Sequence, residues 1–300
     1  MVDKTAIERQ IAAIETAMAV LPLVPVSGRA LVEVGNLSKE FVPPFRLFGK
    51  RGETIRAVAP LDFTIRAGEF VGIVGESGSG KTTIARLLMG LERPSSGTIH
   101  VDGLNLLGQG AATWRMRIAN LQMVFQDPRS SLNPRRTLAR LILQPLEAKG
   151  ADLRAPEARQ RLAELMIATG LDPGLAHRYP SQLSGGQRQR VSIARALAAL
   201  PKVLVADEIV SGLDVSVQAH ILNLLFELRE RHNIALLFIS HDLSVVRYLC
   251  DRVLVMHRGE VVEAGETEKI FASPQAPYTR QLLEAVPPED PMRPWRALAN

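Results

Sequence analysis

Gly75-Glu76-Ser77-Gly78-Ser79-Gly80-Lys81-Thr82 is the most informative motif of this 300-residue chain, because it predicts both a local structure and a ligand. It follows an apolar run, 70–74, precedes a helix-like run, 83–88, and matches the G-x-x-x-x-G-K-[ST] pattern of a P-loop. A strand that ends in glycines and opens a helix turns its backbone N–H groups toward one point at the positive end of a helix dipole. The alternative is a glycine-rich turn with a chance lysine, which leaves the flanking strand and helix unexplained. We therefore expect this loop to bind a polyphosphate.

Each part of the loop has a predicted role. The glycines let the backbone approach the phosphate oxygens, Lys81 reaches the β and γ phosphates, and the Thr82 hydroxyl can bind Mg²⁺. The loop residues expected to contact the nucleotide are Gly75, Glu76, Ser77, Gly78, Ser79, Gly80, Lys81, Thr82 and Thr83.

Composition restricts the classes of function. A formal charge of +5 permits polyanionic partners, but 36 basic against 31 acidic residues is a modest excess, so we expect no nucleic-acid partner. The single cysteine, Cys250, excludes an internal disulfide and a thiolate metal cluster, which fits a reducing cytoplasm. No run approaches the ~20 apolar residues that a membrane-spanning helix needs. Any membrane role must act through partners.

A second predicted anion-binding helix start lies about a hundred residues after Lys81. Ser184 is a favourable N-cap, and Gly185 and Gly186 bare the backbone ahead of Gln187 and a helix pattern over 188–200. An ordinary capped helix is the simpler reading. Two such helix starts in a chain with one P-loop suggest a single ligand site to which both contribute.

Three further strands are each followed by a polar candidate. The buried strand 203–206 precedes Asp207 and Glu208, the Walker B arrangement, in which Asp207 holds Mg²⁺ and Glu208 orients or deprotonates the attacking water. Gln126 follows the strand 120–125 and can reach a metal or a water. His241 follows the strand 234–239 and can contact a γ-phosphate, although a lone histidine is usually structural. Ligands of such sheets bind at these strand ends.

The rest of the chain suggests flanking parts. Residues 7–21 carry an apolar stripe at helical spacing, which can dock on a partner or pack on its own domain. Strands are predicted at 30–34 and 57–65, separated by a loop in which Phe41 either stacks on a purine or packs in the core. Apolar residues at helical spacing over 135–180 predict a group of helices. Residues 252–263 are predicted to form a hairpin, and the proline-rich tail contains one predicted helix, 279–285.

In their order along the chain these motifs resemble those of the ATP-binding cassette (ABC) ATPases, over roughly residues 31–272. The resemblance implies an α/β fold of the P-loop NTPase type, with a mixed sheet and RecA-like core, an antiparallel β subdomain and a helical subdomain. The expected domains are an N-terminal helix and linker (1–29), the ATPase domain (30–272, with the helical subdomain at about 130–190) and a C-terminal extension (273–300).

Residues 125–135 and 277–287 are similar to the ATPase subunits of bacterial dipeptide, oligopeptide and nickel importers. That likeness implies hydrolysis of ATP with Mg²⁺, two integral membrane permease subunits, an extracytoplasmic solute-binding protein, and a position at the cytoplasmic face of the cell membrane. It also implies a second, non-identical cassette that pairs head to tail with this chain. The residues expected to contact ATP in trans are Ser184, Gly185, Gly186, Gln187 and Asp214.

The same likeness implies roles for single residues. Phe41 is the base-stacking position, Thr82, Gln126 and Asp207 surround Mg²⁺, and His241 contacts the γ-phosphate. The catalytic set is then Glu208, His241, Gln126 and Lys81.

The chain also differs from that subfamily at three positions. Ile209 and Gly212 stand where proline and alanine are usual, and Ala276 where histidine is usual. A helical Gly212 would cost about 0.5 to 1 kcal/mol.

Two rival functions stay open. One is a soluble accessory ATPase resembling those of the phosphonate-cleaving lyase, and the other is an exporter subunit. DNA-repair and chromosome-organising cassettes, which insert a coiled coil or cysteine pairs after the P-loop, do not fit a spacing of about a hundred residues and one cysteine.

Overall fold

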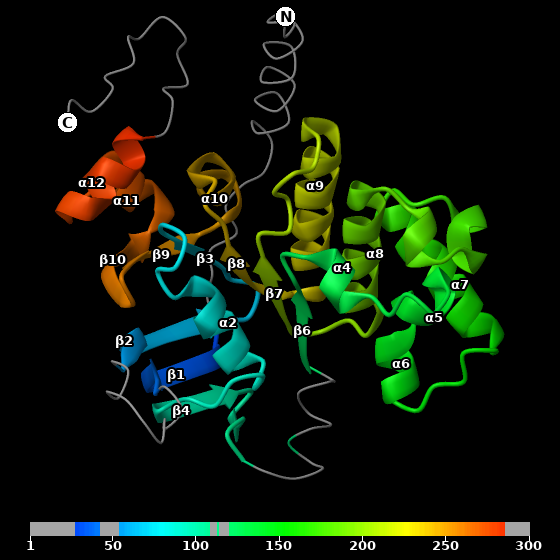
Figure 1. Ribbon diagram of the computed structural model, residues 1–300, viewed down its shortest axis with the longest axis horizontal. Coiled ribbons are helices and arrows are strands. Elements are labelled where there is room, and N and C mark those ends of the chain that lie inside the picture. The colour runs from blue at the N-terminus through cyan, green and yellow to red at the C-terminus, as the bar shows by residue number, and fades with distance from the viewer. Residues whose placement is uncertain (1–27, 43–53, 109–112, 114–119, 286–300) are drawn as a thin grey trace, which may run out of the picture.

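The computed structural model describes residues 28–42, 54–108, 113 and 120–285, and contains two sheets among these residues (Figure 1). The stripe at 7–21 lies outside the described residues, so its packing stays a prediction. Within the described part of the chain, no helix is both long and apolar enough to cross a bilayer.

The smaller sheet is antiparallel and has the strand order β2-β1-β4-β5. Its strands are β1 (Ala30–Phe41), β2 (Ile55–Arg66), β4 (Ser96–Val101) and β5 (Leu104–Asn105). Both β1 and β2 are longer than the sequence predicted, because several register shifts let them pair along their whole length. Phe41 is therefore the last residue of β1, opposite Ile55, and the prediction that it lies in the loop after the strand is wrong.

The larger sheet has the order β10-β9-β3-β8-β7-β6. Its strands are β3 (Phe70–Val74), β6 (Leu121–Val124), β7 (Val203–Asp207), β8 (Ala235–Ile239), β9 (Arg252–His257) and β10 (Glu260–Glu266). All of these pairs are parallel except the predicted hairpin β9–β10. Every residue of β3, β7 and β8 is buried, as expected for parallel strands covered on both faces. The carboxyl ends of β3, β8, β7 and β6 consequently meet at one edge.

Alternate residues of these strands enter two separate cores. Val205 and Leu237 pack with the antiparallel sheet and with α2 (Lys81–Leu88). Leu204 and Leu236 face the opposite way and pack with the helices α5 to α10. The period-2 alternation of the strands thus places the sheet between the antiparallel strands and the helical layer.

The remaining helices cover the sheet and its two ends. Between β6 and β7 lie α4 (Pro128–Ser131), α5 (Leu138–Ile142), α6 (Gln144–Ala148), α7 (Pro156–Ala168) and α8 (Gly185–Ala198), with 3₁₀ turns at Pro173–His177 and Pro180–Gln182. After β7 come α9 (Val215–His232), α10 (Leu243–Leu249), α11 (Thr267–Ala272) and α12 (Pro277–Glu284). Figure 1 shows α4 to α8 at one side and α11 and α12 at the other. The division into domains stays a prediction.

Candidate functional site

The P-loop joins the central strand β3 to α2, so it lies at the carboxyl edge of the sheet (Figure 1). Gly80 is the N-cap of α2, with φ 104°, and no side chain caps this helix end. The first-turn N–H groups of α2 are therefore available to an anion at the positive end of the helix. This arrangement fits the phosphates of a nucleotide.

The glycines of the loop also differ in what surrounds them within the protein, while their predicted role toward phosphate stays a prediction. A Cβ on Gly75 would overlap the Met256 carbonyl of β9, and one on Gly80 would overlap the Ala57 carbonyl of β2. Gly78, with φ 80°, has no atom within 4 Å of its Cβ position. Gly75 and Gly80 thus allow the loop to pack against its own protein, and Gly78 keeps the open side of the loop clear.

Lys81 lies folded over the inside of the loop. Its Nζ donates to the carbonyl oxygens of Gly75 at 2.8 Å and Glu76 at 2.6 Å. Burial lowers the pKa of this ammonium, while the carboxylates of Glu208 and Asp207 act in the opposite direction. The charge is thus held at the centre of the loop, where it can meet phosphate oxygens.

Thr82 and Asp207 come together although 125 residues separate them. The Thr82 hydroxyl donates to Asp207 Oδ1 at 3.4 Å, across the gap between α2 and the end of β7. Burial raises the pKa of Asp207, and the hydrogen bond from Thr82 opposes that shift. Both oxygens are ligands that suit Mg²⁺, and no group of three or more His, Cys, Asp or Glu side chains in the described ranges could hold a metal by itself. The pair fits an ion that is shared with phosphates.

Glu208 has a strained backbone and an engaged carboxylate. Its φ of 50° is left-handed, and its N–H donates to the Ile239 carbonyl at 2.9 Å. Gln126 Nε2 donates to its Oε2 at 2.6 Å, and His241 Nδ1 lies 3.4 Å from its Oε1. Because β6, β7 and β8 are adjacent and parallel, the three side chains that follow them meet at one point. Such strain is typical of functional positions.

The segment after Glu208 carries two of the unusual residues. Ile209 is fully buried, and its carbonyl accepts a hydrogen bond from Gln189 of α8 at 3.1 Å. Gly212 is not helical, because its φ is 73°, and nothing lies within 4 Å of its Cβ position. The predicted cost of a helical glycine therefore does not apply, since this backbone conformation favours glycine. Asp214 follows as the N-cap of α9 and accepts from the Val217 N–H.

The Ser184 motif lies away from the P-loop of the same chain. Ser184 caps α8 in a reciprocal capping box with Gln187, and Ser184 and Gly185 are exposed. The helix contacts β6, which β7 and β8 separate from β3, the strand that leads into the P-loop. The two predicted anion-binding helix starts therefore belong to different parts of the sheet edge.

Phe41 presents an exposed ring on the antiparallel sheet. Its partner Ile55 is two residues from Ala57, whose carbonyl lies against Gly80, so Phe41 is at the end of the sheet that is near the P-loop. The Lys39 ammonium lies 4.8 Å from the centre of the ring. This placement leaves Phe41 free to meet a base.

Sequence reasoning missed two contacts of the P-loop with the end of the chain. The Glu76 N–H donates to the Tyr278 hydroxyl at 3.1 Å, across 202 positions of sequence. The Gly259 N–H donates to the Ser79 carbonyl at 3.0 Å. No local pattern around Tyr278 indicates such a contact, because it depends on the order of the strands.

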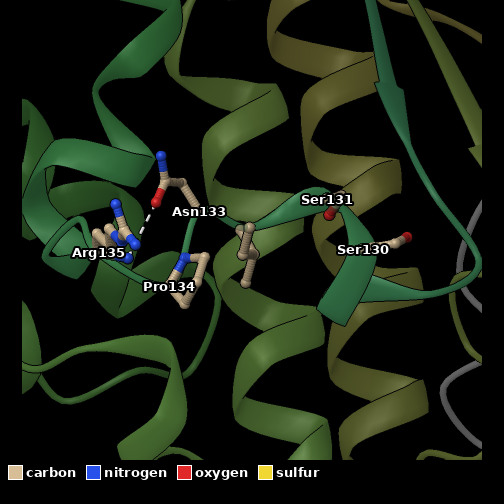
Figure 2. Close-up of a pocket in the computed structure, with 6 residues that line it drawn as sticks. Ser130, Ser131, Asn133, Pro134 and Arg135 are labelled. Carbon is tan, nitrogen blue, oxygen red and sulfur yellow. Dashed lines mark hydrogen bonds between the residues drawn. The ribbon is translucent and has the colours of Figure 1, made fainter.

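A hollow of about 560 Å³ lies beyond Gln126 at the start of the helical layer (Figure 2). The Asn133 side-chain oxygen accepts from the Arg135 N–H at 2.9 Å, which shapes the rim. The lining residues are Ser130, Ser131, Leu132, Asn133, Pro134 and Arg135.

Two protein-family models match the chain. Residues 58–211 match the model described as "ABC transporter". This range contains the P-loop, the Ser184 motif and the two carboxylates at the end of β7. Residues 262–300 match the model described as "Oligopeptide/dipeptide transporter, C-terminal region".

Similar proteins align with most of the chain. It is 48% identical to the probable peptide ABC transporter ATP-binding protein y4tS of Sinorhizobium fredii, over 88% of this chain and 74% of that protein. It is 43% identical to the oligopeptide transport ATP-binding protein OppF of Haemophilus influenzae, over 87% of this chain and 79% of that protein.

A solved structure is also similar in fold. The ATP-binding cassette MJ0796, in a dimeric post-hydrolysis state bound to ADP and Pi, matches 79% of this chain and 98% of its own with a TM-score of 0.71 and 31% identity. The comparison confirms the α/β cassette fold that the motifs predicted.

Proposed function

Because the chain belongs to the ABC transporter family of ATP-binding cassettes, which hydrolyse ATP, we propose that it powers import of a peptide or related small solute. It does so as the ATPase subunit of a complex with separate membrane subunits. The observation that carries this proposal is the match of residues 262–300 to the C-terminal region of oligopeptide and dipeptide transporters. The similarity to y4tS, a probable peptide transporter protein, and to OppF, an oligopeptide transport protein, supports the same solute class.

The convergence of side chains at the sheet edge supports a hydrolytic mechanism. Lys81 and the N–H groups of the loop and of the first turn of α2 hold the phosphates of ATP. Thr82 and Asp207, whose side-chain oxygens lie 3.4 Å apart, would hold Mg²⁺, and Gln126, which donates to the neighbouring Glu208, is proposed as a further ligand. The bound ion supplies neutralisation of the phosphate charge.

Glu208 is proposed to act on the attacking water. It orients the water and accepts its proton as the new bond from oxygen to the γ-phosphorus forms. The bond between the γ-phosphorus and the bridging oxygen breaks, and ADP leaves with that electron pair. His241, whose Nδ1 lies 3.4 Å from Glu208 Oε1, is proposed to contact the transferred phosphate. Its contact with Glu208 positions both groups for the same reacting centre.

The separation of the P-loop from Ser184 supports a dimer with two shared sites. Each ATP would lie between the P-loop of one cassette and Ser184 to Gln187 of the other, with Asp214 at the interface. The dimeric state of the similar cassette MJ0796 supports such pairing. We propose that the second cassette is not identical, since importers of this type commonly use two different ATPase chains.

The remaining partners are proposed from the same family membership. They are two integral membrane permease subunits and, indirectly, an extracytoplasmic solute-binding protein, with no nucleic acid. The chain would sit at the cytoplasmic face of the cell membrane. The hollow at Ser130 to Arg135, which follows Gln126 in the chain, is where we expect a membrane subunit to approach.

Affinity purification tests the proposal. A tagged Glu208→Gln form would be purified with ATP from gently solubilised native membranes, and its partners identified by mass spectrometry. We expect two multi-span proteins and a second, different cassette. Recovery only from the soluble fraction together with enzyme subunits would overturn the importer and support an accessory ATPase like those of the phosphonate-cleaving lyase.

A further inference from the structure

The C-terminal segment is fastened to the sheet by one carboxylate. Glu263 of β10 accepts hydrogen bonds from the backbone N–H groups of Gln275 at 2.8 Å and Ala276 at 3.0 Å. These two residues immediately precede α12, so Glu263 fixes the point at which the helix begins. Leu282 and Leu283 of α12 then pack against the core. Figure 1 shows α12 at the β10 end of the sheet, on the opposite side of the molecule from α4 to α8.

The pairing of β3 with β9 places the end of β9 level with the start of the P-loop. Val74 at the end of β3 is paired with Val255 of β9, so Glu76 is level with His257 at the end of β9. The Tyr278 ring stacks on His257 with the ring centroids 4.0 Å apart and the planes at 14°. The stack therefore brings the Tyr278 hydroxyl to the start of the loop.

The hydroxyl accepts one specific loop N–H. The Glu76 N–H donates to Tyr278 Oη at 3.1 Å, and this N–H is consequently directed toward α12. Tyr278 is half-buried, and burial raises the pKa of its phenol, so the hydroxyl keeps its proton at neutral pH. Behind the same loop, Gly75 packs against the Met256 carbonyl and the Gly259 N–H donates to Ser79. The last strands and α12 thus hold one wall of the P-loop.

From this geometry we infer that Tyr278 is a positioning residue for ATP: the C-terminal extension holds the P-loop, through Tyr278 and His257, in the conformation that receives the phosphates. The inference rests on the proposed function in taking ATP as the ligand. A loop that is already ordered loses less conformational entropy when the nucleotide binds. The C-terminal region therefore acts on the nucleotide site of its own chain.

Tyr278→Phe tests this inference, because it removes the hydroxyl and keeps the ring stack. In the full chain carrying Glu208→Gln, which binds without turnover, calorimetry with Mg·ATP should show a Kd raised about two- to twelve-fold, the effect of one hydrogen bond. In the wild-type background the KM for ATP should increase by the same factor with kcat unchanged. Hydrogen exchange of the nucleotide-free protein should be faster in the peptide that contains Glu76.

Tyr248→Phe is the matched control. Tyr248 is a partly buried tyrosine of α10 that packs edge-on against Phe226, and its loss of a hydroxyl should change neither the Kd nor exchange of the loop. Equal Kd values and equal loop exchange in Tyr278→Phe and the parent protein would overturn the inference and leave the proposed function intact. If the parent binds no Mg·ATP, the proposed function fails instead, and exchange of the nucleotide-free loop still decides the role of Tyr278.

Discussion

Replacing Glu208 by glutamine separates ATP binding from ATP hydrolysis at this site. Glutamine has the size and shape of glutamate, so the left-handed backbone at this position, with φ 50°, carries the same strain in both proteins. The hydrogen bond of the backbone N–H to Ile239 is also kept. What changes is the carboxylate that lies 2.6 Å from Gln126 Nε2 and 3.4 Å from His241 Nδ1.

The expected magnitude follows from the role of that carboxylate. An amide cannot accept the proton of the attacking water, and general-base catalysis contributes about 10²- to 10⁴-fold. Since each tenfold change corresponds to about 1.36 kcal/mol, the barrier should increase by about 2.7 to 5.4 kcal/mol. The Kd for Mg·ATP should change little, because Lys81 and the loop N–H groups, which hold the phosphates, are untouched.

The rate of phosphate release from the purified transporter complex measures ATP hydrolysis. Calorimetry on the same preparation measures the Kd for Mg·ATP. Glu268→Gln is the control. Glu268 is an exposed carboxylate of α11 that pairs with Arg247 of α10, so its replacement should leave both values unchanged. Steady-state hydrolysis within threefold of the wild type would refute the role assigned to Glu208. Loss of ATP binding together with hydrolysis would show that the carboxylate acts in binding rather than in the chemical step.

Two further predictions concern the frame around the site. Gly75→Ala places a Cβ on the Met256 carbonyl and should abolish ATP binding in a calorimetric titration. Gly212→Ala meets open space and should only lower the free energy of unfolding, by about 1 kcal/mol. Equal ATP affinities in the two variants would contradict the packing argument. Asp251→Asn breaks a mostly buried ion pair with Arg229 at 2.9 Å and should cost about 2 to 4 kcal/mol in urea unfolding; a loss below 1 kcal/mol would show that the amide satisfies the same partners.

Local sequence was enough to predict the chemistry of the site. The P-loop and the pair Asp207 and Glu208 are contiguous, and each follows an apolar strand that is recognisable by its composition. The pattern therefore predicts which groups occupy the carboxyl ends of strands. The structure brings Gln126, Glu208 and His241 together there, as parallel strands require, while their catalytic roles stay predictions.

Strand pairing explains what the local sequence did not predict. Phe41 was expected in a loop, but β1 continues to that residue because β2 offers backbone partners as far as Ile55. The strand order also brings the carbonyls of Met256 and Ala57 against Gly75 and Gly80, whose role toward phosphate stays a prediction. Neither partner can be identified from the residues near the glycines in sequence.

The P-loop, the carboxylates at the end of β7 and most of the strands and helices were predictable from residues that are close in the chain. The contact of Glu76 with Tyr278, 202 positions away, and the position of the Ser184 helix beside β6 were not, because both depend on which strands are neighbours. Long-range packing selects the strand order β10-β9-β3-β8-β7-β6, and no local period specifies it.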